Sequence, residues 1–373
     1  KNGLQAGRYL QTGGTETAGT EGYNLAGASY DSVSFSIASE TSVSWGVFFN
    51  TNGTKMYIVG VVESTVYQYS LSTPFDLSTA SYDSVSFDVS GQETSVLDVA
   101  FNTNGTKMYI TGSSTDSIYQ YSLSTGFDLS TASYDSVSFD VSGQDTFPSD
   151  TFFSADGAKM YVIGDSSDRV HQYSLSTAFD LSTASYDSVS FDVSGQDTSP
   201  RGVTFTTNGT KMYVVGSTND NVYQYSLSTG FDLSTASYDS VSFDVSGQAT
   251  LPSSISFSDD GAKMFLLGTT NDTVYQYSTA LLTQTLDLST GSYFSFTPSG
   301  ATTVSFTNAP ASGKAVGFAV EINGDGSAIT WPSSVKWPSG VAPTATASKE
   351  VYAFVTTDGG TSYYGKLAGS DIA

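Results

Sequence analysis

The 373-residue sequence contains no cysteine, one histidine and only 13 lysines and arginines, against 36 aspartates and glutamates. The absence of cysteine excludes disulfide bonds and thiolate metal sites. The net charge of −23 argues against a nucleic-acid partner and against anionic membrane surfaces, because both require clustered basic side chains. No apolar run approaches the roughly 18 residues of a membrane-spanning helix. We therefore expect no nucleic-acid binding and no membrane insertion.

The sequence is dominated by a repeat of constant length. A Lys-Met dipeptide recurs every 52 residues, and the copies account for all five methionines. Its lysines are Lys55, Lys107, Lys159, Lys211 and Lys263. The segments Y-Q-Y-S and S-Y-D-S-V-S-F keep the same period, with His171 replacing the first tyrosine of Y-Q-Y-S in the third copy. Five copies without an insertion indicate a repeat architecture in which each unit packs on its neighbours.

Each copy is predicted to form four short strands. In the second copy, these strands span residues 96–102, 107–112, 118–123 and 134–141. The pair Asn104-Gly105 between the first two strands tolerates positive φ and predicts a hairpin turn. The last strand alternates apolar with polar residues, whereas the middle strands are mostly apolar and are expected to be covered on both faces. Four strands per repeat are typical of a β-propeller blade.

The order of the copies predicts a closed ring of five blades. A strand of the outermost type, at residues 30–37, precedes every inner strand, and the last copy ends at residues 274–278 without an outer strand. The N-terminal strand can therefore complete the fifth blade and remove the open edge; a solenoid of the same repeats is the alternative. We predict an all-β chain with a linker or arm at 1–27, a five-bladed propeller at 28–280 and a small β-sandwich-like domain at 281–373.

Two stretches of the sequence carry a resemblance to known proteins. The repeat "NGTKMYIVG…VYQYSLSTPFDLSTASYDSVSF" is similar to propeller repeats of bacterial and bacteriophage surface proteins. The C-terminal stretch, with "ITWPSSVKWPSG" and "FVTTDGGTSYYGKLAG", resembles a domain found near the ends of phage tail and fibre proteins. The resemblance covers residues 28–373. It implies a tail, fibre or spike protein at the virion surface, homotrimeric as such fibres often are.

Candidates for catalysis are few. A Ser-His-Asp triad would have to use His171, whose place in a tyrosine position favours packing instead. Glycosidases use paired carboxylates, but Glu93, Asp145 and Asp197 occupy equivalent places in successive blades, where we expect solvated loop charges. The sequence has no zinc spacing, no Walker loop and no D-x-D-x-D-G calcium loop. We therefore expect no enzymatic activity, no catalytic residue, no metal and no cofactor, with Ca²⁺ as an alternative because oxygen ligands abound.

Comparison of the copies with one another predicts a binding face. Their differences gather at the entry to the first strand and in the turn between the second and third strands, whereas the other connections barely change. In an up-and-down blade, the two varied connections lie on the same face of the ring. One equivalent position on this face is occupied by Trp45, Leu97, Ser149, Arg201 and Ser253. An exposed tryptophan or arginine there is a plausible ligand anchor, and neutral drift of the loops is the alternative.

Beside this position, Asp98 and Asp150 are expected to point toward the central channel, either as solvated acids or as ligands of a cation or a sugar. The predicted ligand-binding face comprises Trp45, Glu63, Leu97, Asp98, Asp150, Asp168, Arg169, Arg201 and Asp220.

These observations predict a non-enzymatic virion protein that displays its propeller for attachment to the host surface. A glycan is the expected ligand, because tryptophan faces and dense Ser, Asn and Asp groups suit sugars, and other virion proteins are the expected partners. The alternatives are a structural decoration or connector of the virion, a glycan-degrading enzyme, and a bacterial adhesin that is secreted or held at the cell surface.

Overall fold

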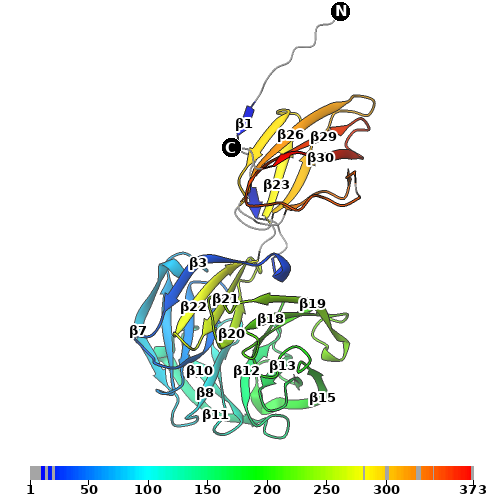
Figure 1. Cartoon of the computed structure of the whole chain (residues 1–373). Helices are drawn as coiled ribbons and strands as arrows, with labels where there is room; N and C mark the ends of the chain where they lie inside the picture. Colours follow the sequence, from blue (N-terminus) through cyan, green and yellow to red (C-terminus); the bar gives the residue numbers. More distant parts are fainter. Residues whose placement is uncertain are drawn as a thin grey trace, which may run out of the picture. The chain divides into compact units, whose positions relative to one another are not determined.

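The computed structural model describes residues 10–12, 16–18, 22–279, 282–298, 302–324, 329–338 and 340–370 (Figure 1). The chain divides into two compact units. One comprises residues 30–278, and the other comprises residues 1–29 together with 279–373. The first unit is the predicted five-bladed β-propeller, and its four-stranded antiparallel sheets follow the 52-residue repeat.

The strands of each blade follow one another in chain order from the central channel outward. Blade 1 contains β4 (Ser44–Phe49), β5 (Lys55–Gly60), β6 (Thr65–Leu71) and β7 (Ala80–Asp88). Blade 2 contains β8 (Val96–Phe101), β9 (Lys107–Gly112), β10 (Ser117–Leu123) and β11 (Ala132–Asp140). Blade 3 contains β12 (Pro148–Phe153), β13 (Lys159–Gly164), β14 (Arg169–Leu175) and β15 (Ala184–Asp192). Blade 4 contains β16 (Pro200–Phe205), β17 (Lys211–Gly216), β18 (Asn221–Leu227) and β19 (Ala236–Asp244).

Blade 5 closes the ring with strands from both ends of the repeat region. It contains β20 (Pro252–Phe257), β21 (Lys263–Gly268), β22 (Thr273–Ser278) and, as its outer strand, β3 (Ser29–Ser36). The first strands β4, β8, β12, β16 and β20 contact one another in a closed circle. The predicted closure by the N-terminal strand is therefore confirmed, and the solenoid alternative is wrong.

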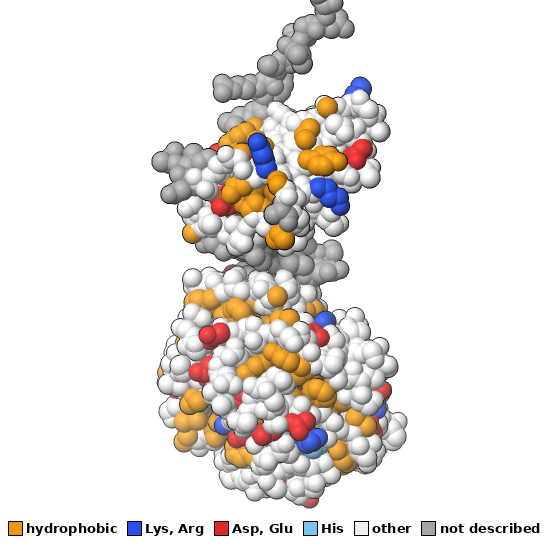
Figure 2. Space-filling model, turned by 45° about the vertical axis from the view of Figure 1, so that its right-hand side comes forward, with side chains coloured by type: hydrophobic (Ala, Val, Ile, Leu, Met, Phe, Trp, Pro, Cys, Tyr) orange, Lys and Arg blue, Asp and Glu red, His pale blue; other side chains and the backbone are white. Residues whose placement is uncertain are grey.

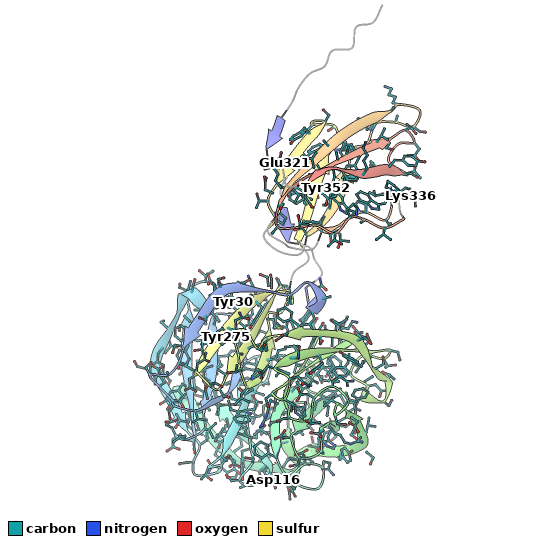
Figure 3. All side chains as sticks on the ribbon, in the orientation of Figure 1. Tyr30, Asp116, Tyr275, Glu321, Lys336 and Tyr352 are labelled. Carbon is teal, nitrogen blue, oxygen red and sulfur yellow. The ribbon has the colours of Figure 1, made fainter. Side chains whose placement is uncertain are left out.

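The side chains that secure β3 repeat those of every other blade. In blade 2, the Lys107 ammonium lies 2.6 Å from the Asp135 carboxylate. In blade 5, the equivalent pair joins Lys263 to Asp31 at 2.6 Å, although these residues are 232 positions apart in the sequence. Tyr30 of β3 packs on Tyr275 of β22 with ring centroids 6.0 Å apart (Figure 3). The closing strand thus uses the same contacts as a strand supplied by its own blade.

Polar contacts between blades recur with the same period. The Gln120 side-chain carbonyl accepts a hydrogen bond from the Leu181 N–H of blade 3 at 2.9 Å. The Tyr109 hydroxyl donates to the Phe179 carbonyl of blade 3 at 2.6 Å. Because these groups are buried or nearly so, each bond satisfies polar atoms that would otherwise lie unpaired between blades. Leu181 begins one of the 3-10 turns that precede the outer strands: η1 (Leu25–Gly27), η2 (Leu77–Thr79), η3 (Leu129–Thr131), η4 (Leu181–Thr183) and η5 (Leu233–Thr235).

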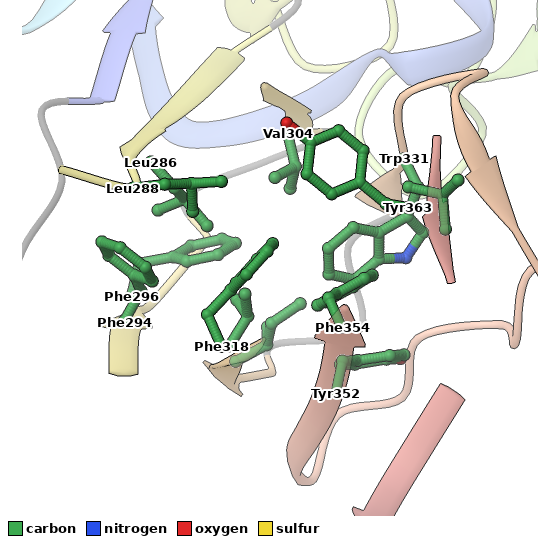
Figure 4. Close-up of a cluster of buried hydrophobic side chains, with 13 residues drawn as sticks. Leu286, Leu288, Phe294, Phe296, Val304, Phe318, Trp331, Tyr352, Phe354 and Tyr363 are labelled. Carbon is green, nitrogen blue, oxygen red and sulfur yellow. The ribbon is translucent and has the colours of Figure 1, made fainter. Parts of the chain in front are cut away.

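The second unit contains two sheets that share one aromatic core, in agreement with the sandwich prediction. The six-stranded sheet has the order β1-β24-β26-β29-β30-β28, and the four-stranded sheet has the order β2-β23-β25-β27. Its C-terminal strands are β23 (Leu282–Asp287), β24 (Tyr293–Phe296), β25 (Thr302–Thr307), β26 (Val316–Asn323), β27 (Ile329–Thr330), β28 (Val335–Lys336), β29 (Lys349–Thr356) and β30 (Tyr363–Ser370). Phe318 and Phe354 stack with centroids 5.2 Å apart, and Trp331 packs on Phe354 at 5.0 Å (Figure 4). Trp331 of the first W-P motif is therefore a core residue.

The N-terminal segment differs from the predicted linker. It contains β1 (Leu10–Thr12), which pairs in parallel with β24, and β2 (Glu16–Ala18), which pairs antiparallel with β23. Each strand has only three residues, so neither shows a periodic pattern that would predict it. The pairing of β1 and β2 covers one edge of each sheet of the sandwich.

Candidate functional site

The two varied connections lie side by side in every blade that shows their contacts, as the sequence predicted. In blade 1, Val61 lies in the turn between β5 and β6, and Val43 lies in the segment that leads into β4. The Val61 N–H donates to the Val43 carbonyl at 2.8 Å. In blade 2, Ser113 and Ser95 make the equivalent bond at 3.1 Å. We call this side of the ring the varied face. The opposite side, where the Phe127 N–H donates to the Gly105 carbonyl, is the uniform face.

A cluster of three side chains from three blades occupies the varied face. Trp45 comes from β4 of blade 1, Phe147 directly precedes β12 of blade 3, and Arg201 lies in β16 of blade 4. The Arg201 Cζ atom lies 4.8 Å from the centroid of the Trp45 ring and 5.8 Å from that of Phe147. The two rings meet edge to face at 6.4 Å. Because these residues belong to or adjoin the channel-lining strands, they gather at the channel mouth.

Polar neighbours hold the arginine in this cluster. The Arg201 Nε donates to the Ser217 hydroxyl at 3.1 Å, and Nη2 lies 3.4 Å from a carboxylate oxygen of Asp165. Burial lowers the pKa of Arg201, and the Asp165 charge acts in the opposite direction, so the guanidinium remains a cation. The Trp45 indole N–H and the second Asp165 oxygen are buried without a protein partner. Both are unsatisfied polar groups in the interior of the cluster.

The channel carboxylates were predicted to be exposed to water, and this prediction is wrong. Asp98 and Asp150 are only 4% and 6% exposed. Asp98 accepts a hydrogen bond from the Thr151 N–H of blade 3 at 3.1 Å, and Asp150 accepts one from the Val203 N–H of blade 4 at 2.7 Å. The cause is a break in register where each first strand begins, which turns these side chains onto the next blade.

The same two carboxyl groups are hydrogen-bonded to each other. Burial raises the pKa of Asp98 to about 6. Burial and the Asp98 charge raise the pKa of Asp150 well above its ordinary value. Both shifts favour protonated carboxyl groups in the channel wall, where the pair joins blades 2, 3 and 4.

Leu97 is a second correction. It is only 2% exposed, so it cannot anchor a ligand on this face. The position nevertheless carries Trp45 and Arg201 in other blades, where both are partly exposed.

The remaining predicted face residues support turns and do not join the cluster. Glu63 accepts a hydrogen bond from the Thr41 hydroxyl at 2.7 Å, and Asp220 accepts one from the Leu251 N–H at 3.0 Å. Arg169 pairs with Asp192 of its blade's outer strand at 2.9 Å. Asp168 has φ of 53°, which places it in a turn.

Phe147 and Asp165 are the site residues that the sequence prediction missed. Phe147 lies in the varied entry segment, where its counterparts Val43 and Leu251 are exposed apolar residues. This apolar character was the available signal.

The equivalent acids Glu93, Asp145 and Asp197 were predicted to be solvated, but they are at most 2% exposed. Each receives hydrogen bonds from the second turn of its own blade. Asp145, for example, accepts from the Ser167 N–H at 2.9 Å. The acids thus replace water as partners for backbone donors of the turn and fix the shape of the varied face.

His171 lies beside Ser167 and Asp145, yet the three do not form a nucleophile–base pair. The Ser167 hydroxyl donates to Asp145 at 2.5 Å, so its proton does not point at the imidazole. His171 Nε2 lies 3.0 Å from the same hydroxyl, in the place where other blades position a tyrosine hydroxyl. Burial lowers the pKa of His171, which keeps the ring neutral. This geometry fits a packing role better than the activation of a serine.

Within the described part of the chain, no three His, Asp or Glu side chains are grouped closely enough to hold a metal ion. None of its helices is long and apolar enough to cross a membrane. In the space-filling view, uncharged polar side chains and backbone cover most of the visible propeller surface, with scattered carboxylates (Figure 2).

No family model matches the sequence, and no curated protein matches it. Among solved structures, a functionally unknown protein from Desulfotomaculum acetoxidans is 13% identical over 60% of this chain and 62% of its own, with a TM-score of 0.38. A candidate 6-phosphogluconolactonase from Bacteroides uniformis is 19% identical over 60% and 63%, with a TM-score of 0.40. A luciferin-regenerating enzyme is 12% identical over 66% and 94%, with a TM-score of 0.39. The chain thus spans less than two thirds of the first two neighbours, and at these values none of the three bears on function.

Proposed function

We propose that this chain is a non-enzymatic virion protein of the tail, fibre or spike type, which attaches the particle to a glycan on the host surface. The observation that carries the attachment role is the cluster of Trp45, Phe147 and Arg201 at the channel mouth. It assembles two aromatic rings and a cation from three separate blades, on the face where the copies differ. The likeness of the C-terminal domain to phage tail and fibre domains supports the virion context.

The chemistry of the cluster suits a sugar. An aromatic ring offers an apolar surface to the C–H groups of a pyranose, and the guanidinium offers planar N–H donors to its hydroxyls. Because each site is small, we expect weak binding per chain and strong attachment only when several chains act together.

The exposed side of the C-terminal sandwich favours such an assembly. Val355 of β29 and its cross-strand partner Tyr364 of β30 are 39% and 60% exposed. Apolar groups gathered on one sheet favour packing against another chain. We propose that the protein is a homotrimer, and sedimentation of the full chain tests this: a monomer at micromolar concentration would refute it.

The attachment role is tested by cell binding. We expect the double variant Trp45→Ala/Arg201→Ala to bind host cells at least roughly tenfold more weakly than the wild type, as the loss of two anchors predicts. The matched control is Arg169→Ala, which removes one charge at the rim, where Arg169 pairs with Asp192. Equal binding by the wild type and the double variant would refute this site. Release of new reducing ends from host polysaccharide would refute the non-enzymatic proposal.

A further inference from the structure

The uniform face carries pockets between the blades. Two of them, between blades 2 and 3 and between blades 3 and 4, have the same volume of about 580 Å³. Their linings are related by the 52-residue repeat. Lys107, Gln120 and Val137 of one correspond to Lys159, Gln172 and Val189 of the other. This volume lies in the range of small-molecule sites.

The floor of the pocket is rigid. The Gln120 amide nitrogen donates to Asp135 at 2.8 Å while its carbonyl accepts from Leu181, so one side chain joins both blades. The Lys107 ammonium directs two of its three N–H bonds at Ser122, at 2.9 Å, and at Asp135, at 2.6 Å. Its side chain is 32% exposed, which leaves a third donor available to a ligand.

The wall from the next blade is held in an uncommon backbone conformation. Phe179 has φ of 61°, in the left-handed region that residues other than glycine rarely adopt. Bonds from both sides impose it: the Phe179 N–H donates to the Gly157 carbonyl at 3.1 Å, and Tyr109 donates to the Phe179 carbonyl. A Cβ atom on Gly157, itself at φ of 70°, would lie 2.2 Å from the ring, so the ring covers this glycine. Part of the ring remains exposed and lines the pocket.

Next to the ring lies an acceptor. Asp180 uses one oxygen to receive the Ser182 N–H and hydroxyl, at 3.0 and 2.6 Å. Its other oxygen is available to a ligand hydroxyl. Each pocket therefore combines an aromatic ring, an ammonium donor and a carboxylate acceptor. Asp135 and Asp180 together outweigh the charge of Lys107, so the lining disfavours anions.

The same set of residues recurs at further junctions. Gln68 bonds the Leu129 N–H, and Gln276 bonds the Leu77 N–H, each at 2.9 Å. The hydrogen bonds between blades explain why a glutamine recurs at each junction. They do not require the part-exposed lysine, the part-exposed ring and the exposed serine that recur beside it. The rings at the four junctions are Phe75, Phe127, Phe179 and Phe231, all with positive φ.

We propose that these inter-blade pockets are equivalent subsites for a neutral hexopyranose, four to a chain, on the face opposite the Trp45 cluster. The ring of the sugar packs on the phenylalanine while its hydroxyls bond the lysine ammonium and the free aspartate oxygen. The choice of a sugar rests on the proposed function, whereas the location rests on the pockets at two junctions and on the equivalent residues at the other two. The uniform face thereby gives one chain several equal contacts with a repetitive polysaccharide.

The test is saturation-transfer NMR of the full chain with the methyl glycosides of glucose, galactose and mannose. We expect a signal from at least one of them. It should weaken roughly fivefold or more in a variant with Phe75, Phe127, Phe179 and Phe231 all changed to leucine, which removes the aromatic surface but keeps apolar bulk. Thermal unfolding checks that this variant folds. If it does not, a second variant changes the exposed Ser78, Ser130, Ser182 and Ser234 to glutamine, which narrows the pocket openings.

The control Trp45→Ala separates this inference from the proposed function. Retention of the signal in Trp45→Ala, with loss in the pocket variants, supports the subsites. The reverse pattern overturns them and leaves the Trp45 cluster as the sugar site. Absence of a signal from all three glycosides overturns the subsites as well. If the Trp45→Ala/Arg201→Ala variant binds host cells as well as the wild type does, the proposed function is refuted, but the NMR result for the pocket subsites is unaffected.

Discussion

Replacing Asp150 by asparagine should stabilise the propeller at neutral and alkaline pH and leave it nearly unchanged in acid. Asp150 and Asp98 are hydrogen-bonded to each other in the channel wall, and burial raises the pKa of both in the folded protein. Asparagine keeps an oxygen that can accept from the Val203 N–H, and its amide can donate to Asp98 without binding a proton. The variant therefore keeps the contacts and removes the need for protonation.

The magnitude follows from proton linkage. Because the folded pKa of Asp150 is raised, the stability that its proton contributes is complete below the unfolded pKa, 3.8, and is lost as the pH rises through the folded value. While the folded protein holds this proton and the unfolded chain has released it, the free energy of unfolding falls by about 1.4 kcal/mol per pH unit. From about pH 4 to about pH 6, this amounts to about 3 kcal/mol. Since the buried amide has its own desolvation cost, we expect a gain on the order of 2 kcal/mol.

Urea unfolding across this pH range measures the effect. The difference between the Asp150→Asn variant and the wild type should be near zero in acid and should grow as the pH rises above about 4. The control is Asp140→Asn. The Ser142 contacts lower the pKa of the exposed Asp140, so its charged form contributes stability that is present at higher pH. The Asp140→Asn variant should therefore be no more stable than the wild type at any pH, and any loss of stability should appear only at higher pH. A pH-independent difference, or a variant less stable than the wild type at every pH, would refute the reasoning.

Two further variants test the packing within and between blades. A Cβ atom on Gly164 would lie 2.0 Å from the Asp145 carboxyl carbon, so Gly164→Ala should cost about 1–3 kcal/mol of unfolding free energy, whereas Gly143→Ala, with open space around it, should be neutral. Thermal unfolding of both decides this, and equal stabilities would contradict it. Gln120→Leu leaves the buried Leu181 N–H unpaired and should cost about 1–3 kcal/mol. Amide hydrogen exchange at Leu181 should be faster in this variant than in the wild type. Unchanged exchange would contradict the role of the Gln120–Leu181 hydrogen bond in joining the blades.

The ring was predictable because its evidence lies in the spacing of residues. The constant period of the Lys-Met dipeptide fixes the number of blades, and an outer-type strand that comes first in the chain requires closure by β3. The polarity of the ring followed from comparing copies, since connections that join antiparallel strands alternate between its two faces.

Side-chain placement was less predictable, because it depends on contacts between blades that the repeat pattern does not show. Leu97 and Asp98 were expected at the surface and in the channel water, but they are only 2% and 4% exposed, and Asp98 bonds the Thr151 N–H of the next blade. Glu93 looked like a loop charge, yet it accepts hydrogen bonds from a turn about twenty residues later in the sequence. The short strands β1 and β2 were not predicted either, because they form by pairing with strands more than 260 residues away and have no periodic pattern of their own. Phe147 could have been found by its apolar counterparts in other blades.

The central claim is that the varied face binds the host glycan, and a crystal structure of the full chain with oligosaccharide released from the host surface tests it most directly. The account predicts sugar density against the Trp45 ring, within hydrogen-bonding distance of the Arg201 guanidinium. Density confined to the inter-blade pockets or to other surfaces, with the Trp45 cluster empty, would contradict it.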